Sequence, residues 1–165
     1  MKKCGKKEYN PGMAGDGATT PEITTSDEIK DSFTLEVGKP ALLGRPDDSP
    51  ELEKFKLLLI DGLDENESIS KYAVQLELRS DGRIIVSRPR FNIGGKEYVG
   101  QNLIVVMGSD HKQGMVEDEY DAGIGGKNLE NLYVGDDKAE NCFSLSIEEN
   151  NRVVINEVFA NGEKL

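Results

Sequence analysis

The chain has 165 residues, 31 of them acidic and 20 basic, which gives a formal net charge of −11 at pH 7. A chain of this length fits one domain of ordinary size, able to bury about two-thirds of the surface that its unfolded form exposes. Contacts to phosphate need clustered Lys and Arg, so this charge excludes nucleic acid as an expected partner. Anionic lipid would also repel the chain, and membrane attachment would therefore need a covalent anchor.

The first 31 residues combine glycine, proline and threonine with almost no bulky apolar side chain. Such a segment cannot bury enough apolar surface to offset the entropy cost of ordering it. We therefore expect a flexible tail or tether over residues 1–31 and a single β domain over residues 32–165. No apolar run approaches the roughly eighteen residues of a membrane-spanning helix.

Short apolar stretches separated by turn residues predict strands along the rest of the chain. The alternation from Tyr72 to Arg79 is the clearest, and Asp81-Gly82 after it is a strong hairpin signal, because both residue types tolerate a positive φ. A run of apolar residues at 103–106 is typical of a strand covered on both faces. In chain order, strands are expected at about 33–37, 41–43, 55–60, 72–79, 84–86, 91–93, 97–99, 102–107, 143–147 and 152–159.

The connections between these strands contain little helical pattern. Ser49 can cap one helical turn over residues 50–54, and no segment has the apolar spacing of an amphipathic helix over three turns. The segment from Ser109 to about Asn131 is the longest one expected to be irregular. Eight to ten strands in hairpins predict an all-β fold, either an antiparallel β-sandwich or a small barrel, with a disordered N-terminal tail.

The N-terminal layout suggests a cellular setting. Cys4 is followed by Gly5-Lys6-Lys7-Glu8, then by the Gly/Thr-rich tail and the β domain. This arrangement resembles the mature start of small secreted bacterial lipoproteins, in which a lipidated Cys precedes a polar tether. Met1-Lys2-Lys3 replace the small and apolar residues that precede such a Cys. The resemblance implies a trimmed N-terminus, lipid attachment at Cys4, and a place in the cell envelope or among secreted proteins; the alternative is a cytoplasmic chain.

The only other cysteine is Cys142, so a disulfide framework and an all-Cys zinc site are excluded. We interpret Cys142 as a small buried hydrophobic residue. A Cys4–Cys142 bridge is the alternative, and it would have to be reached through the tail.

The segment from Asp110 to Asp121 contains the only histidine and the densest group of carboxylates in the sequence. Its carboxylates at Asp110, Glu117, Asp118 and Asp121 are candidate ligands for Ca²⁺, which prefers several oxygen ligands in a flexible loop. The spacing does not fit an EF-hand, and a solvated acidic loop is the alternative. No other cofactor is indicated.

The same region supplies the candidate partner-binding loop, with His111, Tyr120 and Lys127 as its contact residues. His111 is the only histidine, too few for a His-based metal site or a nucleophilic triad without a placed Ser or Cys. Deleting residues 112–126 should then abolish partner binding and spare folding.

The sequence contains no recognisable catalytic motif, so an enzymatic function is the less favoured interpretation. The leading hypothesis is an extracytoplasmic, lipid-tethered binding or accessory module whose partner is an unknown protein or small ligand. The second is a barrel that carries a small ligand in an apolar cavity. The third is a carboxylate-based hydrolase that uses Asp118 or Asp121.

Overall fold

The computed structural model describes residues 28–29, 32–47, 49–63 and 66–165. Cys4 and nearly all of the expected tail lie outside this part of the chain. The described residues form fifteen strands and two single-turn 3-10 helices, η1 (Pro50–Leu52) and η2 (Glu149–Asn151). Neither helix is long and apolar enough to cross a membrane. The expected all-β fold with antiparallel sheets is confirmed.

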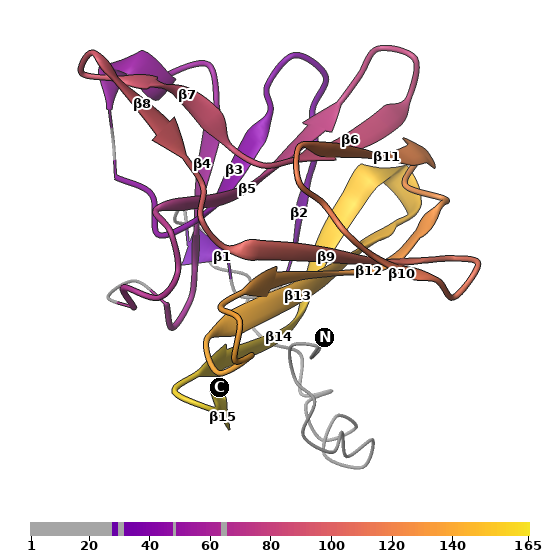
Figure 1. Ribbon diagram of the computed structural model, residues 1–165. Coiled ribbons are helices and arrows are strands. Elements are labelled where there is room, and N and C mark those ends of the chain that lie inside the picture. The colour runs from indigo at the N-terminus through magenta and orange to yellow at the C-terminus, as the bar shows by residue number, and fades with distance from the viewer. Residues whose placement is uncertain (1–27, 30–31, 48, 64–65) are drawn as a thin grey trace.

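Two large sheets and one separate hairpin make up the architecture (Figure 1). The six-stranded sheet has the order β1 (Glu28–Ile29), β4 (Lys56–Ile60), β3 (Ala41–Gly44), β5 (Tyr72–Leu78), β6 (Arg83–Ser87), β11 (Glu119–Ile124). The seven-stranded sheet has the order β10 (Gln113–Met115), β9 (Leu103–Gly108), β12 (Leu129–Gly135), β13 (Cys142–Glu148), β14 (Arg152–Ala160), β15 (Glu163–Lys164), with β2 (Ser32–Thr34) also paired to β14. The hairpin consists of β7 (Arg90–Ile93) and β8 (Lys96–Val99).

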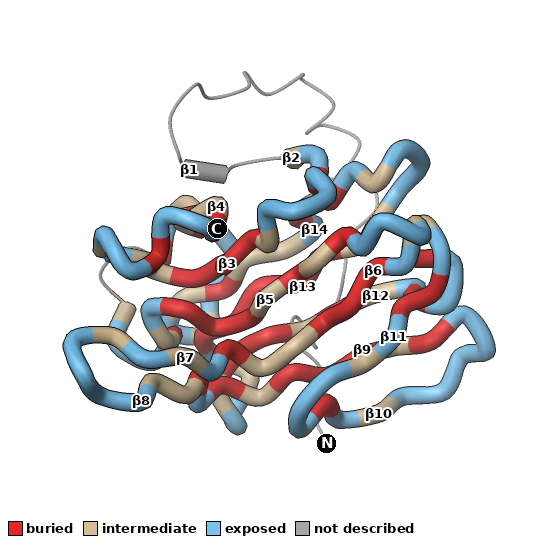
Figure 2. The backbone as a smooth tube through the Cα atoms, turned by 90° about the horizontal axis from the view of Figure 1, so that it is seen from above, coloured by how far each residue is buried: buried red, intermediate tan, exposed pale blue. Residues whose placement is uncertain are grey.

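One hydrophobic core lies between the two large sheets, and Figure 2 shows its buried residues along their central strands. Side chains alternate across a strand, so Val74 and Leu76 of β5 face this core while Gln75 and Glu77 face outward. Phe143 of β13 joins them from the opposite sheet. The strands form two open sheets with a filled interior, so the arrangement is a sandwich and not a closed barrel.

A second, smaller apolar cluster covers the outer face of the six-stranded sheet. The β7–β8 hairpin places Phe91 and Tyr98 there, against Phe55 and Tyr72. The four rings contact one another at centroid distances of 5.1–5.5 Å, in tilted, edge-on and stacked pairs. The hairpin expected at 91–99 is therefore confirmed, and its apolar residues hold it on the sheet.

Several expected elements are confirmed, and one predicted loop is wrong. The hairpins β5–β6 and β13–β14 are present, and the Ser49 hydroxyl accepts a hydrogen bond from the Glu51 N–H at 3.4 Å to cap η1. Residues 109–131, expected to be irregular, form β10, β11 and the start of β12. β10 forms a short hairpin with the preceding β9, while β11 and β12 pair with β6 and β9, which are more distant in the chain. Local sequence pattern does not reveal these distant pairings.

Other differences come from short strands and edges. β4 pairs in parallel with both β3 and β1. The connection from β3 to the parallel β4 contains the single 3-10 turn η1. β1 lies inside the segment expected to be tail, and the strands outnumber the expected eight to ten. Val37 is 58% exposed rather than half-buried, since β2 ends at Thr34.

Arg88, between β6 and β7, ties three connections together. Its guanidinium donates four hydrogen bonds of 2.7–3.1 Å to backbone carbonyls of Gly100, Asn102, Val116 and Glu117. Its own backbone N–H donates to the Asp118 carbonyl at 2.9 Å. Backbone carbonyls in the connections between strands have no hydrogen-bond partner in a sheet. The planar guanidinium carries several N–H donors and satisfies several of these carbonyls at once.

Arg88→Ala should lower the free energy of unfolding by roughly 2–4 kcal/mol, because it leaves these half-buried carbonyls without their charged donor. Urea denaturation followed by circular dichroism measures the change. Arg90→Ala, which removes only an exposed pair with Glu97, should cost at most about 0.5 kcal/mol. Equal effects of the two substitutions would contradict the role assigned to Arg88.

Candidate functional site

Four strand connections meet at one end of the sandwich, toward the right of Figure 1, and we call this end the loop end. The β11–β12 loop lies at its centre. The Gly125 N–H donates to the Gly82 carbonyl in the β5–β6 turn at 2.9 Å, and the Ser109 N–H of the β9–β10 turn donates to the Asn128 carbonyl at 3.0 Å. The fourth connection is the β13–β14 turn.

An open groove of about 770 Å³ separates the β11–β12 loop from the β13–β14 turn. Lys127 and Arg152 are exposed and stand on its opposite walls, and Asn150 extends the second wall. Gly126 forms the narrow part, since a Cβ there would lie 2.9 Å from the Ile147 side chain. Glu148 and Glu149 also line the groove, and the Arg152 guanidinium pairs with the Glu148 carboxylate at 3.0 Å. The groove thus combines an apolar wall with rims that carry charges of both signs.

An exposed apolar side chain lies beside this groove. Ile124, the last residue of β11, is 52% exposed and lies against Gly82 of the neighbouring turn. Isolated apolar residues on a surface are common, but one that sits next to a groove at a cluster of loops is a suitable anchor for a partner.

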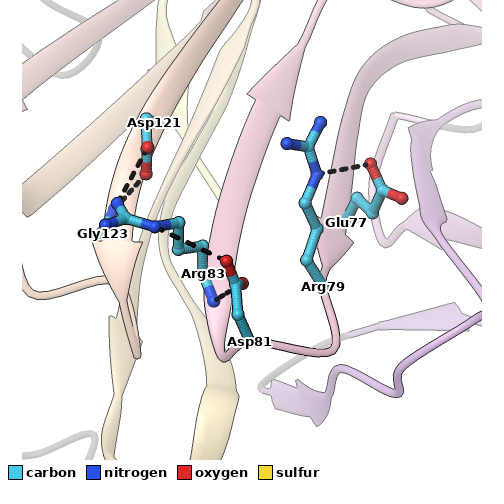
Figure 3. A network of polar contacts seen from close by, with 6 residues as sticks. All are labelled: Glu77, Arg79, Asp81, Arg83, Asp121 and Gly123. Atoms are coloured by element: carbon cyan, nitrogen blue, oxygen red, sulfur yellow. Dashed lines mark hydrogen bonds and ion pairs between the residues drawn. The ribbon is translucent and has the colours of Figure 1, made fainter.

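Asp121 is held on the strand that leads to this end (Figure 3). One carboxylate oxygen accepts from the Gly123 N–H at 2.8 Å, and the other accepts from the Arg83 guanidinium at 3.0 Å. Arg83 also lies 3.7 Å from Asp81, while Arg79 pairs with Glu77 nearby. All these groups are largely exposed, so the network orders the β5–β6 turn and the bulge in β11 more than it adds stability.

Tyr120 lies between two acidic groups. Its hydroxyl donates to the Asn128 carbonyl at 3.1 Å, bridging β11 and the β11–β12 loop. Burial raises the pKa of the phenol above its ordinary value, and the negative charges of Asp110 and Asp121 raise it further. Asp110 itself accepts from the Lys112 N–H at 3.0 Å within the β9–β10 turn.

The candidate Ca²⁺ ligands are spread over the fold. Asp110 lies at the loop end and Asp121 on β11, whereas Glu117 and Asp118 belong to the connection held by Arg88. Among the residues that the structure describes, no three His, Cys, Asp or Glu side chains are grouped so that they could hold a metal ion. The hydrogen bonds of Asp110 and Asp121 identify them as turn and bulge formers.

The structure brings two of the three predicted contact residues to the loop end. His111 is 81% exposed, with its Nδ1 3.3 Å from a Glu130 carboxylate oxygen, and the Lys127 carbonyl accepts from the Ser109 hydroxyl at 2.9 Å. Tyr120, the third, is half-buried behind them. Cys142 is buried at the start of β13, as expected, but it is disulfide-bonded and so is not the free hydrophobic thiol that the sequence favoured. Cys4 lies outside the described residues.

The sequence pattern did not predict which residues form the second wall of the groove or that Arg83 pairs with Asp121. Arg152, Ile147 and Arg83 come from strands distant along the chain, and only the pairing of β13 with β14 and of β6 with β11 places them here. The expectation that residues 112–126 could be deleted without unfolding is wrong, because this segment contains the whole of β10 and β11.

No known family model, curated protein or solved structure matches this chain. The fold and the loop end are therefore the basis for any functional assignment.

Tyr120 should ionise above about pH 10, and Asp110→Asn should move its titration toward the ordinary range by removing one negative charge. The difference in ultraviolet absorbance between the wild type and Tyr120→Phe isolates this phenol during a pH titration. The unfolded chain releases the proton first, so this group also makes stability fall as the pH rises past about 10. Ionisation of Tyr120 below pH 10 would contradict the placement of its hydroxyl.

Proposed function

We propose that this protein is a β-sandwich binding or accessory module that uses its loop end to recognise a protein partner. The observation that carries the proposal is the coincidence of exposed Ile124 with a groove that has Lys127 on one wall and the Arg152–Glu148 pair on the other. A rigid sandwich supports the surrounding loops through backbone hydrogen bonds, which is how many binding proteins position their contact residues.

The chemistry of the loop end favours binding over catalysis. Asp110 and Asp121 accept from backbone N–H groups and, for Asp121, from Arg83, while Glu148 pairs with Arg152. General acid–base catalysis needs carboxylates in unequal environments within a cleft, and neither Asp118 nor Asp121 lines the groove. Ile124 and Lys127, close together in the chain, instead fit a partner that presents an apolar residue beside an acidic one.

Pairs of substitutions test this proposal. The two members of a pair make the same change of charge or polarity at exposed positions, one at the loop end and the other elsewhere. Ile124→Asp and Lys127→Glu change the loop end, while Met115→Asp on β10 and Lys138→Glu in the β12–β13 turn make the same changes elsewhere. Each loop-end substitution should weaken partner binding by about tenfold or more, with folding unchanged, because anchor residues in an interface are each worth about 1–2 kcal/mol. The control substitutions should leave binding within about twofold.

A photoreactive residue at position 124, introduced into the protein in its native cell, provides the partner for this measurement. It should give a discrete crosslinked adduct, identifiable by mass spectrometry, which Lys127→Glu diminishes and Lys138→Glu does not. A photoreactive residue at 138, at the opposite end of β12, should give no such adduct. Identical adducts from both positions would overturn the assignment of the loop end.

We further propose that the module is extracytoplasmic. Its support is the resemblance of the N-terminal layout to secreted lipoproteins, together with the oxidised state of Cys142, because disulfides persist in oxidising compartments. Cys4 is the only other cysteine of the chain, and a sulfur in a disulfide cannot also carry lipid, so this location does not rest on a lipid anchor. The proposal about the loop end does not depend on it.

Protein isolated from its native cell should be found outside the cytoplasm, and after denaturation Cys142 should react with an alkylating reagent only when a reductant is present. The intact mass before and after this treatment measures the difference. A diacyl or triacyl group on Cys4, with partition into detergent, would show instead that Cys4 and Cys142 are not joined in one chain. A cytoplasmic protein whose Cys142 is alkylated without reductant would refute the proposed location.

A further inference from the structure

The β7–β8 hairpin is joined to the sandwich differently from every other strand pair among the described residues. It forms a sheet of its own, with ladder hydrogen bonds only between its two strands. In Figure 1 it lies at the upper left of the view, on the side of the six-stranded sheet. A two-stranded hairpin is marginally stable by itself, so its position depends on contacts at its base, its face and its tip.

The base of the hairpin is fixed. The Arg88 guanidinium donates to the Gly100 carbonyl at 2.8 Å, and the Gly100 N–H donates to the Pro89 carbonyl at 2.9 Å. These bonds hold the two chain ends together where the hairpin leaves and rejoins the sandwich. Any movement of the hairpin must therefore pivot about residues 89–90 and 99–100.

Two side-chain contacts hold the tip of the hairpin: Ile93 packs against the apolar cluster beneath it, and Glu51 binds the turn. The Glu51 carboxylate, on η1, accepts from the Gly94 N–H with both oxygens, at 2.8 and 3.1 Å. Both residues are exposed. Gly94 has φ of +59° and Gly95 has φ of +81°, so the turn that presents this N–H needs glycine.

The face of the hairpin rests on the aromatic cluster and on one hydroxyl. The Tyr98 hydroxyl accepts from the Tyr72 N–H at 3.0 Å and donates to the Tyr72 carbonyl at 3.1 Å. Beneath the hairpin, Leu42, Leu52, Phe55 and Tyr72 form a buried apolar surface that belongs to the sheet and to η1. The open groove of about 670 Å³ beside η1 is lined in part by Leu52 and Phe55, so this surface already reaches the outside at one edge.

We propose that the β7–β8 hairpin is a latched flap: it opens as a unit about its base, while the sandwich stays folded, and the Glu51–Gly94 contact is its latch. Opening breaks the latch, the Tyr98 hydroxyl bonds and the ring contacts together. It leaves both large sheets and their shared core intact, because the flap contributes no strand to either sheet. The open state uncovers the apolar surface beneath. This inference is independent of the proposed role of the loop end.

Amide hydrogen exchange measured by NMR tests the flap through two N–H groups in different elements. Gly94 lies at the tip and Tyr72 lies in β5, and both donate to groups that separate only when the flap opens. Under conditions where exchange follows the opening equilibrium, both should show the same opening constant, together with the ladder amides of β7 and β8. The amides of β13 should exchange much more slowly, because they open only with the whole sandwich. Exchange of Gly94 far ahead of Tyr72 would mean fraying of the tip and would overturn the proposal.

Glu51→Ala tests the latch, and Glu53→Ala, an exposed carboxylate beside η1, is the matched control. Loss of the latch should speed exchange of the Tyr72 amide about fivefold, the factor expected for one hydrogen bond of about 1 kcal/mol. Exchange of the β13 amides should not change. Glu53→Ala should alter neither.

Two results would contradict the latch. If Glu51→Ala speeds the Gly94 amide alone, the contact orders only the turn. If it speeds Tyr72 and β13 by the same factor, it destabilises the whole fold and the hairpin has no motion of its own. Tyr98→Phe provides a second variant: it should raise the opening constant of the β7–β8 amides while leaving β13 unchanged.

Discussion

The guanidinium of Arg88 occupies the point where three chain connections cross, and its four hydrogen bonds to carbonyls determine how they are joined. One connection leads from β6 to the outer hairpin, one leads from that hairpin to β9, and one carries the chain from β10 to β11. Backbone carbonyls in such crossings have no ladder partners, and a planar fork of donors satisfies them without requiring any secondary structure. Both the flap and the path of the chain between the two sheets depend on this contact.

Two buried amides serve the same purpose elsewhere in the fold. The Asn102 side chain accepts from the Ser70 N–H at 2.7 Å and donates to the Ser68 carbonyl at 2.8 Å. Asn141 accepts from the Asn161 N–H at 2.8 Å, and from the Asn66 amide at 2.7 Å. Both amides are nearly inaccessible to solvent, so they hold the connections at the end of the sandwich opposite the loop end. That end is consequently tied down by side chains, whereas the loop end presents exposed side chains around a groove.

The division between the two ends explains why the proposed functions are separable. The loop end is supported by backbone hydrogen bonds between loops, so substitution of Ile124 or Lys127 changes the surface and leaves its scaffold in place. The flap is held by the Glu51 latch and by ring contacts on the outer face of the six-stranded sheet. Because neither set of contacts includes the core between the sheets, each can be altered without unfolding the protein.

The sequence by itself determined the all-β class, the hairpins at Gly82 and at Gly94-Gly95, and the alternation of β5, because φ preference and period-two burial are local properties. It also indicated that the region containing His111 and Lys127 reaches a cluster of loops. Only the tertiary structure decided that β3 and β4 pair in parallel, and that residues 109–131 contain strands. The contacts of Arg88 and Arg152 were also decided by the tertiary structure, because the groups that they meet lie on other strands and connections. The sequence does not show which carbonyls Arg88 will bind or which groove Arg152 will line. These contacts follow from the pairing of strands within the sheets. That pairing is stabilised by burying apolar side chains that lie far apart in the chain.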